Sequence, residues 1–343
     1  MIELQNDSLI FSFPGIHPRA CLHLNLQRTL RIPDDGRDWP LPPGLGRFPM
    51  RHVDDFGNGV PAAWNRHGGV MLPMYQAEAM WLSFDSDWIE GHDAEWPFAL
   101  KIATGKRCAI TGDAWTEALT KDPQNYLVVP SQPWLDGYVV EKGFIRQFVA
   151  MPLGSGYSAE EQLTGEANIG GLQVEVFPMK KEAFLKRWPK VSRRAGGRLK
   201  EMMSPCCCAS PAPDMGLAPG GRMRQEVYED PFDFSEWDLT SSSKCFIHIA
   251  NSVQWRQITG EETPTQPITA RDYSDAGLPW FDYYDADAHA LKGSGALTKL
   301  KSVAQIAKEK QDLDIGDGGG VKQMKIVVLE KKEYPDAVRE GVF

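Results

Sequence analysis

Apolar and polar residues alternate along residues 21 to 32, the clearest pattern in the chain. Every second residue from Leu22 to Ile32 is apolar, and only Arg28 breaks this face. A period of two predicts a strand with one buried face, so His23 on the other face should be more exposed than the leucines. Residues 9 to 13 form another apolar run, and we expect the two runs to pair as a hairpin.

Short apolar runs continue to residue 178, each bounded by Gly, Pro or Asp. They cover residues 79 to 84, 98 to 103, 107 to 111, 126 to 130, 137 to 140, 144 to 152 and 171 to 178. Residues 103 to 106 and 141 to 143 have the composition of hairpin turns. Successive hairpins indicate antiparallel sheets or a sandwich, and they argue against a doubly wound parallel sheet.

Proline and glycine mark the loops and helix ends. Residues 33 to 49 are too rich in Pro and Gly for regular structure, and residues 61 to 67 predict a short helix that begins at Pro61 and stops at Gly68. Residues 244 to 260 fit either a helix that ends at Gly260 or a strand. Further along, we expect a capped helix from 269 to 272 onward, a helix over 297 to 310 and a last strand over 322 to 331.

Residues 179 to 222 differ from the rest, because a strongly basic stretch is followed by a segment rich in Cys, Pro and Gly. We therefore predict an α+β fold, mainly antiparallel sheet or sandwich with a few short helices and long loops. It would contain a β-rich part over 1 to 178, a linker or insertion over 179 to 222, and an α+β part over 223 to 343 that packs on the first.

Composition places the chain among globular proteins: of 343 residues, 42% are hydrophobic and 24% are charged. The net charge of −9 argues against binding to nucleic acid along the whole chain. The acidic and polar N-terminus does not resemble an export signal, and no apolar run reaches the roughly 20 residues that span a bilayer. The six cysteines lack the spacing of a disulfide scaffold. These features predict a cytoplasmic protein.

Several strings carry a resemblance to a known group of proteins. They cover residues 41 to 56, 68 to 81, 123 to 137, 145 to 166, 215 to 232 and 276 to 287. Together they resemble an uncharacterised microbial protein family, bacterial and fungal, of unknown activity. The resemblance leaves out residues 179 to 214 and implies no catalytic residues. It implies that the chain is one recurring unit to which the basic stretch is an addition.

A glycine-rich turn after an apolar strand is the first candidate binding site. Exposed amides at a helix start attract phosphate or carboxylate groups, and the glycines permit close approach. The candidate residues are Gly154, Ser155, Gly156 and Ser158, with Arg146 on the preceding strand as a source of positive charge. The alternative is a structural turn whose amides are satisfied by a capping box at the start of the helix.

Two groups of residues are candidates for catalysis. His52, Asp54 and Asp55 combine an imidazole with carboxylates, as in a base and its orienting acid. Asp282 and Asp285 lie in an aromatic string and have the equipment of a saccharide cleft. The alternative for Asp54 and Asp55 is that they cap a turn. The alternative for Asp282 and Asp285 is that their aromatic string is an ordinary docking segment.

Metal and membrane sites are less well supported by the pattern. Cys245 and His248 have ligand spacing only if their segment is helical, so we predict no metal site. The basic stretch and the cysteines over 180 to 208 combine two signals of membrane-surface contact, but a solvated insertion is the favoured interpretation.

The favoured function is a binding or assembly protein, because long loops and many aromatic residues suit recognition and no catalytic set is complete. A hydrolase acting on a small anionic or saccharide substrate is the alternative. The residues leave open whether the chain is an enzyme, which cofactor it uses, and whether its partner is a small molecule or a protein. The enzyme would be favoured if the two candidate catalytic groups met in one pocket. It would also be favoured if His52, Asp54 and Asp55 met the Gly154 turn in one pocket.

Overall fold

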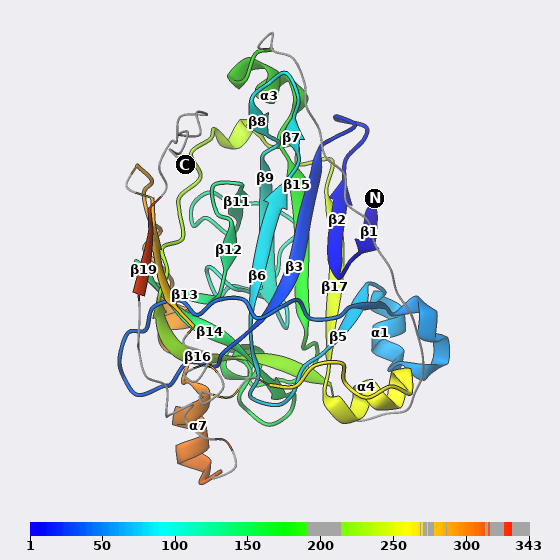
Figure 1. Ribbon diagram of the computed structural model, residues 1–343, viewed down its shortest axis with the longest axis vertical. Coiled ribbons are helices and arrows are strands. Elements are labelled where there is room, and N and C mark those ends of the chain that lie inside the picture. The colour runs from blue at the N-terminus through cyan, green and yellow to red at the C-terminus, as the bar shows by residue number, and fades with distance from the viewer. Residues whose placement is uncertain are drawn as a thin grey trace, which may run out of the picture.

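The computed structural model describes residues 1–190, 214–267, 269, 273, 278–285, 287–312, 315 and 326–330. These residues form an α+β fold with two large, mostly antiparallel sheets and a few short helices (Figure 1). The predicted fold class is therefore confirmed. Among the described residues, no helix is both long enough and apolar enough to cross a membrane.

The first sheet has eight strands, and the N-terminal hairpin begins it. In spatial order it contains β1 (Ile2–Gln5), β2 (Ser8–Ser12), β3 (Cys21–Thr29), β6 (Ala79–Ser86), β14 (Phe144–Pro152) and β13 (Gly137–Glu141). In addition, β12 (Trp134–Leu135) pairs with β6, and β16 (Met215–Arg224) pairs with β14. Strands β2 and β3 pair antiparallel, so the predicted hairpin is confirmed.

The second sheet has seven strands. In spatial order it contains β10 (Arg107–Cys108), β9 (Phe98–Thr104), β15 (Leu172–Pro178), β17 (Ser243–Ala250), β5 (Val70–Pro73) and β4 (Arg51–His52), and β11 (Leu127–Val129) pairs with β9. The pair β17 and β5 is parallel. Two small sheets are formed by β18 (Trp280–Tyr284) with β19 (Ile326–Glu330), and by β7 (Trp88–Ile89) with β8 (Ala94–Glu95).

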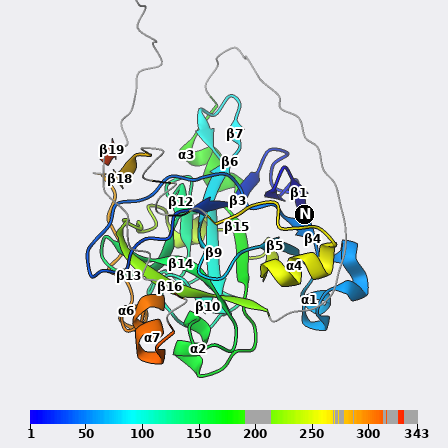
Figure 2. The ribbon, with the colours of Figure 1, turned by 60° about the horizontal axis from the view of Figure 1, so that its bottom comes forward.

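Short helices lie around the sheets. They are η1 (Asp54–Gly59), α1 (Ala62–His67), α2 (Ala159–Thr164), α3 (Lys181–Arg187), η2 (Phe234–Glu236), α4 (Ser252–Thr259), α6 (Gly295–Thr298) and α7 (Val303–Lys310). Figure 2 shows α1 and α4 together on one side of the molecule and α6 with α7 on the other. The predicted helix over 61 to 67 is confirmed as α1, which Gly68 ends with a φ of +61°.

One hydrophobic core contains side chains from both large sheets, including Leu82 from the first and Leu100 from the second. In β3, Leu22, Leu24 and Leu26 are fully buried, whereas the side chain of His23 is 32% exposed. The predicted face of this strand is confirmed, because alternate residues of a strand point to opposite sides of the sheet.

Two segments after residue 178 differ from the expected pattern. The end of the predicted linker forms β16, although it contains Pro219 and three glycines. A Cβ atom at Gly220 would lie 2.6 Å from Val149 Cγ2, so the small residue permits close pairing with β14. Residues 244 to 260 form strand β17 followed by helix α4, and Gly260 ends the helix as predicted.

Segments after residue 213 complete both large sheets, since β16, mostly from the predicted linker, joins the first sheet and β17, from the C-terminal part, joins the second. The cysteine triplet and most of the basic linker, over 191–213, lie outside the described residues, as do most of the predicted capping box at 269 to 272 and the start of the last predicted strand.

Candidate functional site

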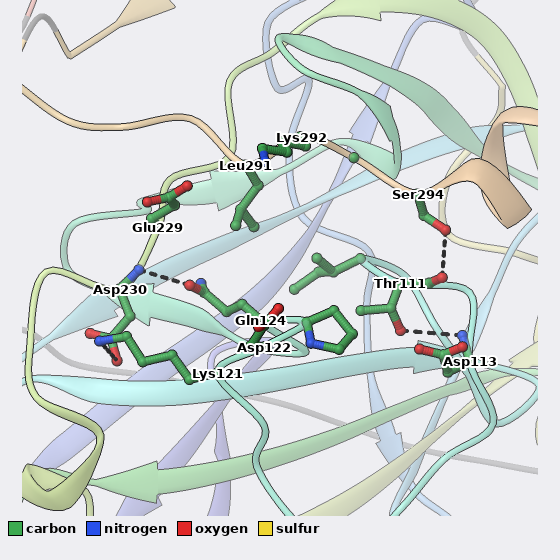
Figure 3. A pocket seen from close by; sticks show the side chains of 13 residues that line it. Thr111, Asp113, Lys121, Asp122, Gln124, Glu229, Asp230, Leu291, Lys292 and Ser294 are labelled. Atoms are coloured by element: carbon green, nitrogen blue, oxygen red, sulfur yellow. Dashed lines mark hydrogen bonds and ion pairs between the residues drawn. The ribbon is translucent and has the colours of Figure 1, made fainter.

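A cavity of about 530 Å³ opens among loops that connect the strands (Figure 3). Segments from three distant parts of the chain meet there, and we call this cavity the acidic pocket. Its lining residues are Ile110, Thr111, Asp113, Lys121, Asp122, Pro123, Gln124, Glu229, Asp230, Leu291, Lys292, Gly293 and Ser294. Loops that meet over a packed sheet are a common setting for binding sites.

The base of the acidic pocket is built around Asp230, whose side chain is completely buried. Its Oδ2 accepts hydrogen bonds from the Tyr126 hydroxyl at 2.5 Å and from Trp237 Nε1 at 2.9 Å. Its Oδ1 accepts one from the backbone N–H of Phe232 at 2.8 Å. The Lys121 ammonium lies 3.7 Å from the carboxylate and supplies a counter-charge. A buried carboxylate needs such partners, so Asp230 is held in one position.

Gln124 forms the rest of this base. Its Oε1 accepts from the backbone N–H of Asp230 at 2.8 Å, and its Nε2 donates to the carbonyl oxygens of Tyr126 at 2.8 Å and Tyr228 at 3.2 Å. The buried amide therefore joins two of the segments that line the pocket. Its hydrogen-bonding groups are used inside the protein, which makes Gln124 a positioning residue.

The rim carries carboxylates that have no partner among the described residues. Asp113, Asp122 and Glu229 are exposed, and their carboxylates make no hydrogen bond or ion pair with any residue that the structure describes. Four carboxylates line the pocket against the ammonium groups of Lys121 and Lys292, so its net charge is negative. A negative pocket attracts ligands of positive charge.

The acidic pocket lacks the arrangement that covalent catalysis requires. The Ser294 hydroxyl donates to the carbonyl oxygen of Thr111, and neither histidine nor cysteine lines the cavity. A nucleophile needs a base within hydrogen-bonding distance. Across the described ranges, no group of three His, Cys, Asp or Glu residues is close enough to hold a metal ion.

The candidate catalytic residues lie apart from one another. His52 is exposed on β4, at the edge of the second sheet, and Asp54 and Asp55 are exposed at the start of η1. Asp282 and Asp285 belong to β18 and the residue that follows it, and Figure 2 shows β4 and β18 on opposite sides of the molecule. The convergence that would have favoured an enzyme is therefore not observed.

Asp282 and Asp285 are also engaged in structural contacts. Both oxygens of Asp282 accept hydrogen bonds from the guanidinium of Arg224, each at 2.9 Å. Asp285 Oδ1 accepts from the backbone N–H of Asp287 at 3.2 Å, and its own backbone N–H donates to the Tyr228 hydroxyl at 2.7 Å. The bidentate ion pair ties β18 to β16, which is a structural role.

The glycine-rich turn before α2 is closed by the protein itself. The carboxylate of Glu161 accepts hydrogen bonds from the backbone N–H groups of Gly156 at 2.6 Å and Ser158 at 3.1 Å. Ser158 and Glu161 form the predicted capping box. The position that an anion would take is thus occupied by Glu161. Gly154 has a φ of +87°, as a tight turn requires.

The charged groups near this turn have other partners. Arg146 lies 3.5 Å from the carboxylate of Asp34 and donates to the carbonyl oxygen of Gly220 at 3.2 Å. The Lys310 ammonium donates to the carbonyl oxygen of Ser155. These contacts match the structural alternative for the turn.

Cys245 and His248 lie on strand β17, where residues three apart point to opposite faces. His248 Nε2 lies 3.0 Å from the carbonyl oxygen of Gly68, and burial lowers the pKa of His248 to about 3. The imidazole is therefore neutral at physiological pH and part of the structure. These two residues do not form the shared helical face that a metal site there would need.

The residues of the acidic pocket were not among those that the sequence singled out. Asp113, Asp122 and Glu229 resemble ordinary surface acids, and no spacing rule connects the first two with Glu229, which follows them by more than 100 residues. Comparison with protein-family models, curated proteins and solved structures yields no match. The family resemblance therefore stays a prediction.

Proposed function

We propose that the chain is a binding protein whose acidic pocket holds a small molecule with one or more amino groups. The observation that carries this proposal is the set of three rim carboxylates, Asp113, Asp122 and Glu229, which lack partners among the described residues. An ammonium group placed between them would gain charge-assisted hydrogen bonds. A ligand with a second amino group would contact two sides of the rim at once.

The shape of the site supports the same class of ligand. A volume of about 530 Å³ accommodates a small molecule, and Ile110, Pro123 and Leu291 supply apolar surface for its hydrocarbon part. Asp230 and Gln124 are already bonded within the protein, so the base should change little when a ligand binds. A site that is formed before binding loses less entropy on association.

A hydrolase is the second candidate function, but fewer observations support it. His52 is exposed on β4, which lies on the opposite side of the molecule from β18 (Figure 2), and both oxygens of Asp282 are bound by Arg224. A saccharide or anion would also meet a pocket of net negative charge in which no aromatic side chain offers a stacking surface.

A comparison of ligand classes by thermal unfolding tests the proposal. We expect 1,4-diaminobutane and spermidine to raise the thermal midpoint, because ligands that bind the folded state stabilise it. Sodium glutarate and glucose should leave it unchanged, and sodium chloride at equal ionic strength controls for screening. A rise with glutarate or glucose and none with the amines would contradict the proposal.

A further inference from the structure

A second cavity, of about 260 Å³, is lined almost entirely by carbon atoms. We call it the aromatic cage. Its lining residues are Leu41, Pro42, Pro43, Gly44, Trp81, Trp134, Asp136 and Phe281. They come from the loop before β4, from β6, from β12 and the residue that follows it, and from β18, so the fold assembles the cage from four distant segments.

The walls of the cage are held in place by packing and backbone hydrogen bonds. Leu41 and Phe281 exchange backbone hydrogen bonds of 2.7 and 2.8 Å, which tie the loop to β18. The rings of Trp81 and Trp134 have centroids 6.4 Å apart and planes 68° apart. The two indoles are therefore in an edge-to-face arrangement, and both line the cavity.

Asp136 brings a carboxylate into this apolar setting. The residue is only 2% exposed, and its Oδ2 accepts a hydrogen bond from Gln225 Nε2 at 2.8 Å. Its Oδ1 receives no hydrogen bond from any described residue. No described Lys, Arg or His lies within ion-pair distance of the Asp136 carboxylate. Burial raises the pKa of Asp136 to about 7, and only the bond from Gln225 opposes this effect. Buried carboxylates are normally paired, so the missing counter-ion is informative.

The aromatic rings of the cage also lack a cation from the described part of the chain. Elsewhere the chain places its own cations over rings, as Lys101 does over Trp115 at 4.4 Å. Within the described ranges, no Lys or Arg lies over Trp81, Trp134 or Phe281. Trp81 Nε1 is buried and has no acceptor there either. The cage therefore offers aromatic surface beside a carboxylate that has no cationic partner among the described residues.

We propose that the aromatic cage is a second binding site, for a quaternary ammonium compound, with Asp136 as its counter-ion. Alkylated ammonium ions interact well with indole faces and have no N–H groups to satisfy, so a carbon-lined wall imposes no loss of hydrogen bonds. A primary amine would lose water from its N–H groups and find only Asp136 in return.

Choline and its uncharged analogue 3,3-dimethylbutan-1-ol test this proposal, since they have nearly the same shape and differ in charge. Calorimetric titration of the whole chain should show choline binding roughly tenfold more tightly than the alcohol. Asp136→Asn should remove most of that difference while the affinity for the alcohol stays the same. Equal affinities of the two compounds for the wild type would overturn the proposal.

A second pair of variants covers the case in which Asp136→Asn does not fold. Trp134→Leu should weaken choline binding roughly tenfold and the alcohol less, whereas Trp88→Leu removes a half-exposed indole outside the cage and should change neither. Unchanged choline binding in Trp134→Leu would contradict the assignment. Spermidine binding at the acidic pocket should be the same in these variants, so the two sites can succeed or fail separately.

Discussion

The guanidinium of Arg28 lies 3.7 Å from the buried carboxylate of Glu78. Arg28 is on β3 and Glu78 directly precedes β6, the strand that pairs with it. Arg28, which interrupts the apolar face of β3, therefore lies beside the carboxyl group of Glu78 from the neighbouring segment. Although the arginine is close, burial dominates and raises the pKa of Glu78 to about 7.

This pKa predicts how stability depends on pH. The folded state binds the Glu78 proton more tightly than the unfolded state, so the stabilisation is complete below about pH 4.5 and is lost as the pH rises to about 7. The shift corresponds to about 3 kcal/mol. Relative to Glu78→Gln, the wild type should lose about this much free energy of unfolding across that range.

Urea titrations of both proteins at several pH values measure this difference. Asp136, whose pKa is also raised to about 7, titrates in both proteins and cancels in the comparison. Parallel pH profiles of the wild type and the variant would show that Glu78 does not titrate in this way.

Gly44 is required where the long loop packs on β6. A Cβ atom at this position would lie 2.8 Å from Trp81 Cζ2 and 2.9 Å from Gln27 Oε1. Gly44→Ala should therefore lower the free energy of unfolding by about 1–3 kcal/mol. Gly15→Ala is the matched control, because a Cβ there meets nothing within 4 Å. Chemical denaturation should separate the two variants, and equal losses would argue against this packing.

The Tyr126 hydroxyl should contribute measurably to stability through Asp230. Tyr126→Phe removes a hydrogen bond of 2.5 Å to a buried carboxylate and leaves the bonds from Trp237 and Phe232. Loss of a hydrogen bond to a charged group costs about 1.5–3 kcal/mol. Urea unfolding measures the difference, and a variant as stable as the wild type would mean that the hydroxyl does not fix Asp230.

The two proposed sites should respond differently to salt. The rim carboxylates of the acidic pocket are exposed, whereas Asp136 is buried. Between about 20 and 500 mM sodium chloride, spermidine affinity should fall severalfold, and choline affinity should fall much less. Calorimetric titrations at the two salt concentrations test this contrast, and equal losses for both ligands would contradict the difference in burial.

Local patterns in the sequence predicted much of the fold. The alternation in β3, the helix that ends at Gly68 and the capping box at Ser158 all depend on neighbouring residues, and the structure confirms them. Strand β16 was missed because Pro219 and its glycines indicate a loop. Its pairing with β14 depends on a contact about 70 residues away, which no local pattern reports.

The sites could not be predicted in the same way. Asp122 and Glu229 meet through loop packing, and nothing in either segment alone indicates a pocket. Trp81 and Trp134 lie in strings that were noted for their resemblance to a family, without any chemistry attached. The pairing of β6 with β12 brings both indoles beside Asp136, and this combination of side chains suggests a binding site. Conversely, His52 and Asp282 have the residue types of a catalytic pair, but their strands, β4 and β18, lie on opposite sides of the molecule (Figure 2).

The affinity of spermidine for two charge-matched double variants tests the central claim most directly. Asp122→Asn with Glu229→Gln removes two rim carboxylates of the acidic pocket, and Asp55→Asn with Glu90→Gln removes two exposed carboxylates elsewhere. By isothermal titration calorimetry, we predict that the first pair weakens binding at least roughly tenfold and that the second changes it by less than about twofold. Equal weakening by both pairs would mean that overall surface charge attracts the amine, and it would contradict a binding site in the acidic pocket.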